Sequence, residues 1–102
     1  MTDIKQAHQA LCQRILEGAG TASQSQRRAA FENAGLGEPL KTLIAKVATQ
    51  AIAVTDGDIA AARASGLTED QLFEIVVCAA VGQSTGQYKS AEAALALALC
   101  EE

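Results

Sequence analysis

The stretch that decides the fold runs from residue 68 to residue 82 and reads TEDQLFEIVVCAAVG. Thr68 and Gln71 form a capping box, in which each side chain bonds the other's backbone N–H, and the two acidic residues between them suit a helix N-terminus. From residue 75 to 81 every residue is apolar, so we expect a helix that is apolar on all sides and whose middle is the most buried part of the fold. We expect this helix to continue to about Cys100.

Helical periodicity predicts four shorter helices before it. No segment shows the sustained alternation of a strand, and the alanine-rich composition with few aromatics favours close-packed helices. The sequence therefore predicts a single all-α domain over residues 1–102, a bundle of about five helices without a sheet. The expected helices are one from residue 2 or 3 to 17, one capped by Ser23 or Ser25 and ending before Gly35, one starting at Pro39 with an apolar face that reaches Ala51, and one from Thr55 to Gly66.

Charge and cysteine content bear on the partners and the cellular compartment of the protein. Eight basic against twelve acidic residues give a net charge of −4, and the basic residues form no stripe, which argues against nucleic acid and anionic membranes as partners. The longest apolar runs are far shorter than the roughly 20 residues of a membrane span. Three widely spaced cysteines do not form a disulfide framework, and the polar N-terminus does not resemble a signal peptide. We expect a cytoplasmic protein.

The stretch KVATQAIAVTDGDIAAARASGLTEDQLFEIVVCAAVG, residues 46–82, resembles the alkylhydroperoxidase D and carboxymuconolactone decarboxylase superfamily. The helix start TDGDI, the segment ARASGLTEDQLFE and the following apolar helix carry the resemblance. It implies an alkylhydroperoxidase D-like helical bundle, a bacterial source and a homo-oligomer, either a dimer, a trimer or a hexamer. The resemblance also allows a related catalytic subunit as a partner.

The motif of the peroxidase branch is missing from this chain. Its Cys-x-x-Cys-x-x-x-His positions fall on Ala51, Val54 and Asp58, so the thiol chemistry of that branch is not expected here. The decarboxylase branch uses a histidine in the same region, and the only histidine of this chain is His8. We therefore expect a non-peroxidase relative that binds a small molecule or serves as an accessory oligomeric protein. The alternative is an enzyme with a relocated, decarboxylase-like proton-transfer site at a subunit interface.

The candidate residues for such a relocated site are Glu74, Cys78, Tyr88 and Lys89. On a helical wheel, Thr85 and Glu92 fall near three of them and would complete the polar lining of a pocket. For Cys78, apolar burial and a neighbouring carboxylate both suppress the thiolate, so a structural core cysteine is the competing interpretation.

Two further patterns need an interpretation. Gly82, Gly86 and Ser90 recur at four-residue steps and form a smooth stripe, which favours close packing against another helix or subunit. His8 and Cys12 lie four residues apart and offer two metal ligands from one helix, but no second local pair completes a structural zinc site. We therefore expect no metal and no cofactor.

Overall fold

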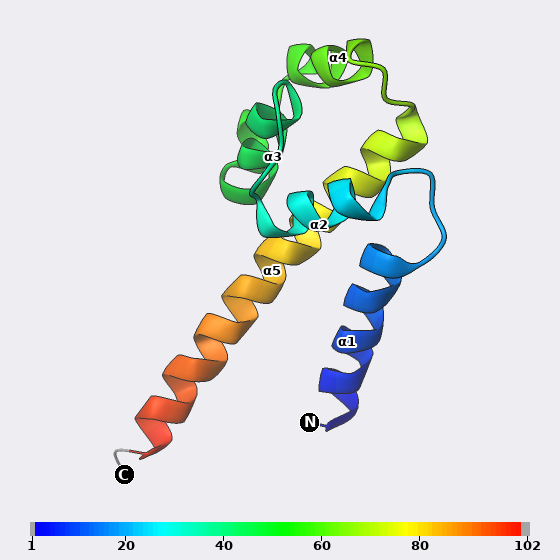
Figure 1. Cartoon of the computed structure of the whole chain (residues 1–102). Coiled ribbons are helices and arrows are strands. Elements are labelled where there is room, and N and C mark those ends of the chain that lie inside the picture. The colour runs from blue at the N-terminus through cyan, green and yellow to red at the C-terminus, as the bar shows by residue number, and fades with distance from the viewer. Residues whose placement is uncertain (1, 101–102) are drawn as a thin grey trace.

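The computed structural model describes residues 2–100 of the chain, with side chains from residue 4 onward. This part of the chain is helical and contains no strand, which confirms the predicted all-α bundle of about five helices. The elements, shown in Figure 1, are α1 (Thr2–Glu17), α2 (Gln24–Glu32), α3 (Leu40–Thr49), the short 3-10 helix η1 (Ala51–Ala53), α4 (Asp56–Ala64) and α5 (Glu69–Cys100).

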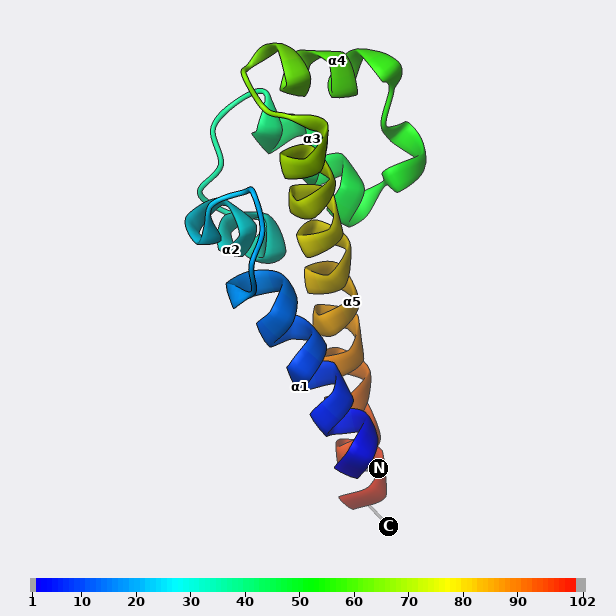
Figure 2. The same ribbon diagram turned by 90° about the vertical axis from the view of Figure 1, so that its right-hand side faces the viewer.

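Helix α5 is the axis around which the other elements are arranged. Its 32 residues span about 48 Å at the usual rise of a helix. Helices α2, α3 and α4 gather around its first half, and α1 runs antiparallel to it, so that both termini lie at the same end (Figures 1 and 2). Toward that end α1 and α5 separate (Figure 1), and the molecule is elongated, 55 × 29 × 20 Å. None of the helices in the described part of the chain combines the length and the apolarity needed to cross a membrane.

The core lies where α2 and α3 pack on the first half of α5. Its largest fully buried side chains are Leu43 and Ile44 of α3 and Ile75 and Cys78 of α5. In the apolar run that we expected to be the most buried part of the fold, Ile75, Cys78 and Ala79 are buried, whereas Ala80 near its end is exposed. Val76 and Val77 are half-buried, so the neighbouring helices cover one face of this run more fully than the other.

Most of the predicted helix ends are confirmed, and the third helix needs a correction. Ser23, rather than Ser25, caps α2 by accepting the N–H of Gln26. Pro39 precedes α3 as its N-cap instead of opening its first turn. Ala51 does not belong to the apolar face of α3, because Gln50 leaves the helical conformation with φ −148° and the chain turns into η1.

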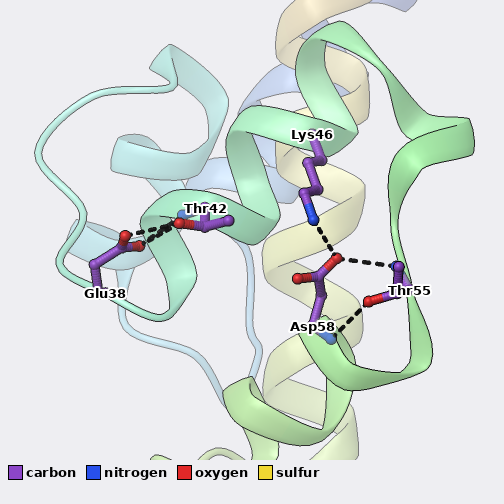
Figure 3. A network of polar contacts seen from close by, with 5 residues as sticks. All are labelled: Glu38, Thr42, Lys46, Thr55 and Asp58. Atoms are coloured by element: carbon purple, nitrogen blue, oxygen red, sulfur yellow. Dashed lines mark hydrogen bonds and ion pairs between the residues drawn. The ribbon is translucent and has the colours of Figure 1, made fainter.

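A network of polar contacts fixes α4 against α3, as Figure 3 shows. Thr55 and Asp58 form a capping box at the start of α4, and the Asp58 carboxylate also accepts from Lys46 Nζ of α3 at 2.7 Å. The hydrogen bond from Lys46, followed by that from the Thr55 backbone, lowers the pKa of Asp58. At the start of α3, Glu38 accepts similarly from the backbone N–H and hydroxyl of Thr42.

Candidate functional site

A groove of about 460 Å³ lies between α1 and the middle of α5. Helix α1 lies closer to α5 near its own C-terminus and diverges from it toward the N-terminus (Figure 1). The groove is lined by Lys5, His8, Gln9, Cys12 and Leu16 of α1, Phe31 of α2, and Thr85, Tyr88, Lys89 and Glu92 of α5.

Three polar side chains meet in this groove. His8 Nε2 lies 3.0 Å from the Thr85 hydroxyl oxygen and 3.5 Å from Cys12 Sγ, and Sγ lies 3.8 Å from the same hydroxyl. The Thr85 hydroxyl donates to the carbonyl of Val81 one turn earlier, at 2.7 Å. His8 and Cys12 sit four residues apart on one face of α1, and Thr85 is buried beneath them. The groove therefore contains a thiol, an imidazole and a hydroxyl within hydrogen-bonding reach.

Charged and aromatic groups surround this cluster. The Tyr88 ring lies over His8 with ring centroids 5.9 Å apart. Lys5 Nζ and Glu92 Oε2 form an ion pair of 3.5 Å across the groove, and Lys89 adds a second ammonium group to the lining. Apolar atoms of Leu16 and Phe31 complete the walls.

Glu74 lies outside this groove and binds the loop between α1 and α2. Its carboxylate accepts from the Thr21 and Ala22 backbone N–H groups, at 2.9 and 2.7 Å, and from the Thr21 hydroxyl at 2.8 Å. Desolvation raises the pKa of Glu74, but these hydrogen bonds and the charge of Arg27 outweigh it, and the net pKa is lowered. A carboxylate held in this way ties the loop between α1 and α2 to α5.

Arg27 binds the other side of the same loop, and its role was not predicted from the sequence. The side chain is only 5% exposed, and its Nη1 donates to the carbonyls of Ile15 and Gly18 at 3.2 and 2.8 Å. Ile15 lies in the last turn of α1 and Gly18 directly follows the helix, where carbonyls lack partners within the helix. The only signal in the sequence was a pair of adjacent arginines, and it gave no hint that the acceptors lie nine and twelve residues earlier.

Cys78 is a core thiol in this structure. It is 1% exposed, and its Sγ lies 3.5 Å from the Ile15 carbonyl oxygen. Burial raises the pKa of Cys78; Glu74 raises it further, and Arg27 acts in the opposite direction. These contacts agree with the interpretation of Cys78 as a structural cysteine.

The structure thus divides the sequence candidates between two places. Tyr88 and Lys89 line the α1–α5 groove, together with the wheel neighbours Thr85 and Glu92. Glu74 and Cys78 line a separate depression of about 360 Å³ with Arg14 and Arg27. Helical-wheel reasoning grouped Thr85, Lys89 and Glu92 but not their partners His8 and Cys12, because those come from a helix more than 70 residues away.

The small-residue stripe has two different surroundings. A Cβ at Gly82 would clash with the backbone of Phe31, whose Cα would lie only 2.8 Å away, so α2 crosses α5 at this glycine. A Cβ at Gly86 would meet nothing within 4 Å, and Ser90 is exposed. Within the described part of the chain, the stripe is covered at one end and open at the other.

The positions of the missing peroxidase motif hold no reactive group. Ala51 is exposed in η1, Val54 is half-buried, and Asp58 is engaged by Lys46 and Thr55. Among residues 4–100, no group of three or more His, Cys, Asp or Glu side chains is arranged to hold a metal ion.

No protein-family model, curated protein or solved structure matches this chain.

Proposed function

We propose that the protein is a non-peroxidase member of the alkylhydroperoxidase D and carboxymuconolactone decarboxylase-like group that binds a small molecule and acts as a homo-oligomer or accessory subunit in the cytoplasm. The all-helical architecture and the resemblance of residues 46–82 support the family assignment. The observation that carries the binding function is the α1–α5 groove, where side chains from two distant parts of the chain converge around His8 and Thr85.

The lining of the groove indicates the class of ligand. Its walls are mostly apolar, and the polar groups are few, which is typical of small-molecule sites. Lys5 and Lys89 supply two ammonium groups against the single carboxylate of Glu92. A small organic acid would place its carboxylate on the lysines and its carbon chain between Leu16 and Phe31.

The size of the molecular surface supports a homo-oligomer. The chain exposes 6786 Å², whereas a compact monomer of 10.5 kDa is expected to expose about 5,400 Å². The radius of gyration, 15.6 Å, likewise exceeds the roughly 12.8 Å of a compact domain of this length. The excess, about 1,350 Å² per chain, is larger than the ~800 Å² that each partner buries in a standard interface.

Exposed apolar surface is concentrated on the end of α5, which we call the arm (residues 86–100). Every side chain of the arm is exposed, and residues 93–100 read AALALALC without a charge. Leu95 and Leu99 share one face of the arm, and Leu97 continues the opposite face beyond Gly86 and Ser90. The arm of a second copy would cover Leu97, and the small stripe on the same face would let the two helices approach closely.

The test of the binding function is a titration of labelled protein with hexanoate, followed by amide chemical shifts, with hexanol as the neutral control. Hexanoate should shift the amides around His8, Thr85 and Lys89, and hexanol should bind more weakly. Lys89→Gln should weaken hexanoate binding, whereas Lys41→Gln, an exposed lysine on α3, should not. Shifts that are absent from the groove, or that are the same in both variants, would reject the proposal.

The enzymatic alternative is left with fewer candidate residues. A relocated site that uses Glu74 together with Lys89 lacks support, because the two side chains line different depressions. A proton-transfer site built on the groove residues Tyr88, Lys89 and His8 remains compatible with the geometry. Turnover of a bound organic acid, observed in the same titration as new resonances of the ligand, would favour this alternative.

A further inference from the structure

We propose that Cys12 is a reactive thiol of the α1–α5 groove, with His8 as its proton acceptor, and that it captures small α,β-unsaturated carbonyl compounds that carry a carboxylate. The proposal rests on the binding function proposed above and names the chemistry of the same site. Cys12 differs from the other two cysteines in its surroundings, because Cys78 is sealed in the core and Cys100 lies exposed at the end of the arm.

The first observation is the pairing of a thiol with a base in a concavity. Cys12 Sγ lies 3.5 Å from His8 Nε2, and both side chains are half-buried in the lining of a groove large enough for a small organic molecule. A nucleophile with a base within reach, and a further group that holds the base, is the usual arrangement of an activated side chain. Thr85 and the Tyr88 ring hold His8 in place here.

The second observation is the position of the Thr85 hydroxyl beside both groups. A threonine hydroxyl has one proton, and Thr85 gives it to the Val81 carbonyl at 2.7 Å. Its oxygen also lies 3.0 Å from His8 Nε2 and 3.8 Å from Cys12 Sγ, so it holds this ring nitrogen beside the thiol. In the tautomer that carries the ring proton on Nδ1, Nε2 accepts the proton of the Cys12 thiol. The imidazolium formed in this way donates to the thiolate, and this charge-assisted contact stabilises the nucleophile.

The reaction balances without any further reagent. The thiol proton of Cys12 passes to the imidazole of His8, and Sγ forms a bond to the β-carbon of the unsaturated compound. The π electron pair of the carbon–carbon double bond moves toward the carbonyl oxygen, and His8 returns the proton to the α-carbon. The product is a single adduct, a thioether in which Cys12 Sγ is bonded to the β-carbon of the now saturated carbonyl compound.

The groove favours this class of compound over a peroxide. Peroxide oxidation would leave a sulfenic acid that needs a second thiol or another reductant, and neither Cys78 nor Cys100 lines the groove. Lys5 and Lys89 line the same groove as Cys12 and would bind a carboxylate on the electrophile.

The test uses trans-benzoylacrylate and its ethyl ester on the full chain, with mass spectrometry following each cysteine separately. Cys100 is the internal reference for an exposed thiol, and glutathione corrects for the intrinsic reactivity of the two probes. Cys12 should react at least about tenfold faster than Cys100 although it is less accessible. Equal or slower reaction of Cys12 would overturn the proposal.

Two variants separate the roles of the neighbours. His8→Gln keeps a hydrogen-bond donor for Thr85 and removes the base, so the rate at Cys12 should fall to that of Cys100 or below for both probes. Lys89→Gln should slow the acid and leave the ester unchanged, while Lys41→Gln should slow neither. A Cys12 rate that His8→Gln does not change would overturn the proposal. Because hexanoate binding is measured without any reaction, a slow thiol in a groove that binds hexanoate would reject only the chemistry proposed here.

Discussion

Glu74 shows how a single side chain can look catalytic in the sequence and prove structural in three dimensions. Its spacing from Cys78 suggested a proton acceptor beside a thiol, but its oxygens are already occupied by the loop before α2. Because backbone N–H groups donate to it, the carboxylate does for this loop what an N-terminal cap does for a helix. Arg27 binds the carbonyls on the other side of the same loop.

We expect Glu74→Gln to lower the free energy of unfolding by about 1–2 kcal/mol at pH 7, because the neutral amide accepts these hydrogen bonds less strongly. The pKa of Glu74 is lower in the folded chain than its ordinary value of 4.5. Its contribution is therefore present above that value and is lost as the pH falls through the folded pKa. Urea unfolding at pH 7 and at pH 3 should show the difference between variant and parent shrinking at the lower pH.

The matched control for this change is Glu69→Gln. Glu69 forms an exposed ion pair with Arg63 at 3.2 Å, and such pairs contribute little to stability. A loss as large as that of Glu74→Gln, or a loss that does not depend on pH, would contradict the assignment of Glu74 to the loop.

Gly82 carries the close crossing of α2 over α5. Gly82→Ala should lower the free energy of unfolding by about 1–3 kcal/mol, because the new methyl group meets the Phe31 backbone, which cannot rotate away. Thermal unfolding of the dilute protein measures this change. Gly57→Ala in α4 is the control, since its Cβ would make only an ordinary contact of 3.6 Å with Thr55, and it should be neutral or stabilising.

At the scale of elements, α4 depends on Asp58, whose carboxylate joins the cap of α4 to Lys46 of α3 (Figure 3). Asp58→Ala removes both contacts, so the amides of residues 54–58 should exchange with deuterium faster, while those of residues 72–82 in α5 should not change. The pKa of Asp58 is lowered, so its contribution is present above its ordinary value of 3.8 and is lost as the pH falls further.

Asp56→Ala is the corresponding control, because Asp56 is an exposed acid in the same turn of α4. Hydrogen exchange followed by mass spectrometry compares the two variants directly. Equal acceleration in both would mean that the charge at the helix N-terminus, rather than the link to α3, holds α4 in place.

At the scale of the whole molecule, the exposed arm is what distinguishes this chain from a compact monomer. Leu97 is 68% exposed, and Leu97→Glu would place a charge in the proposed contact between two arms. We expect this variant to sediment as a lighter species than the parent protein, with unchanged helix content, since the arm makes no contribution to the core. Analytical ultracentrifugation over a range of concentrations measures this directly.

Ile52→Glu provides the comparison, because Ile52 is 99% exposed on η1, away from the arm. It removes a large apolar side chain from the surface just as Leu97→Glu does. A parent protein that sediments as a monomer at all concentrations, or dissociation caused equally by both variants, would reject the arm as the interface.

The sequence by itself determined the helices of this protein. Capping residues such as Thr55 and Thr68 and the periodicity of the apolar positions are local signals, so they predicted five helices and most of their ends. They also placed Thr85, Lys89 and Glu92 on one face of α5, and they placed Gly82 where a helix could approach closely.

Only the tertiary structure decided which of these residues act together. Whether Glu74 faces a pocket or a loop depends on contacts with Thr21 and Ala22, more than 50 residues away, and the sequence carries no local signal for them. The same holds for His8 and Cys12, which become a candidate site because the packing of α1 on α5 brings Thr85 beside them. Local energetics set the elements, whereas the convergence of side chains from separate helices depends on how those elements pack.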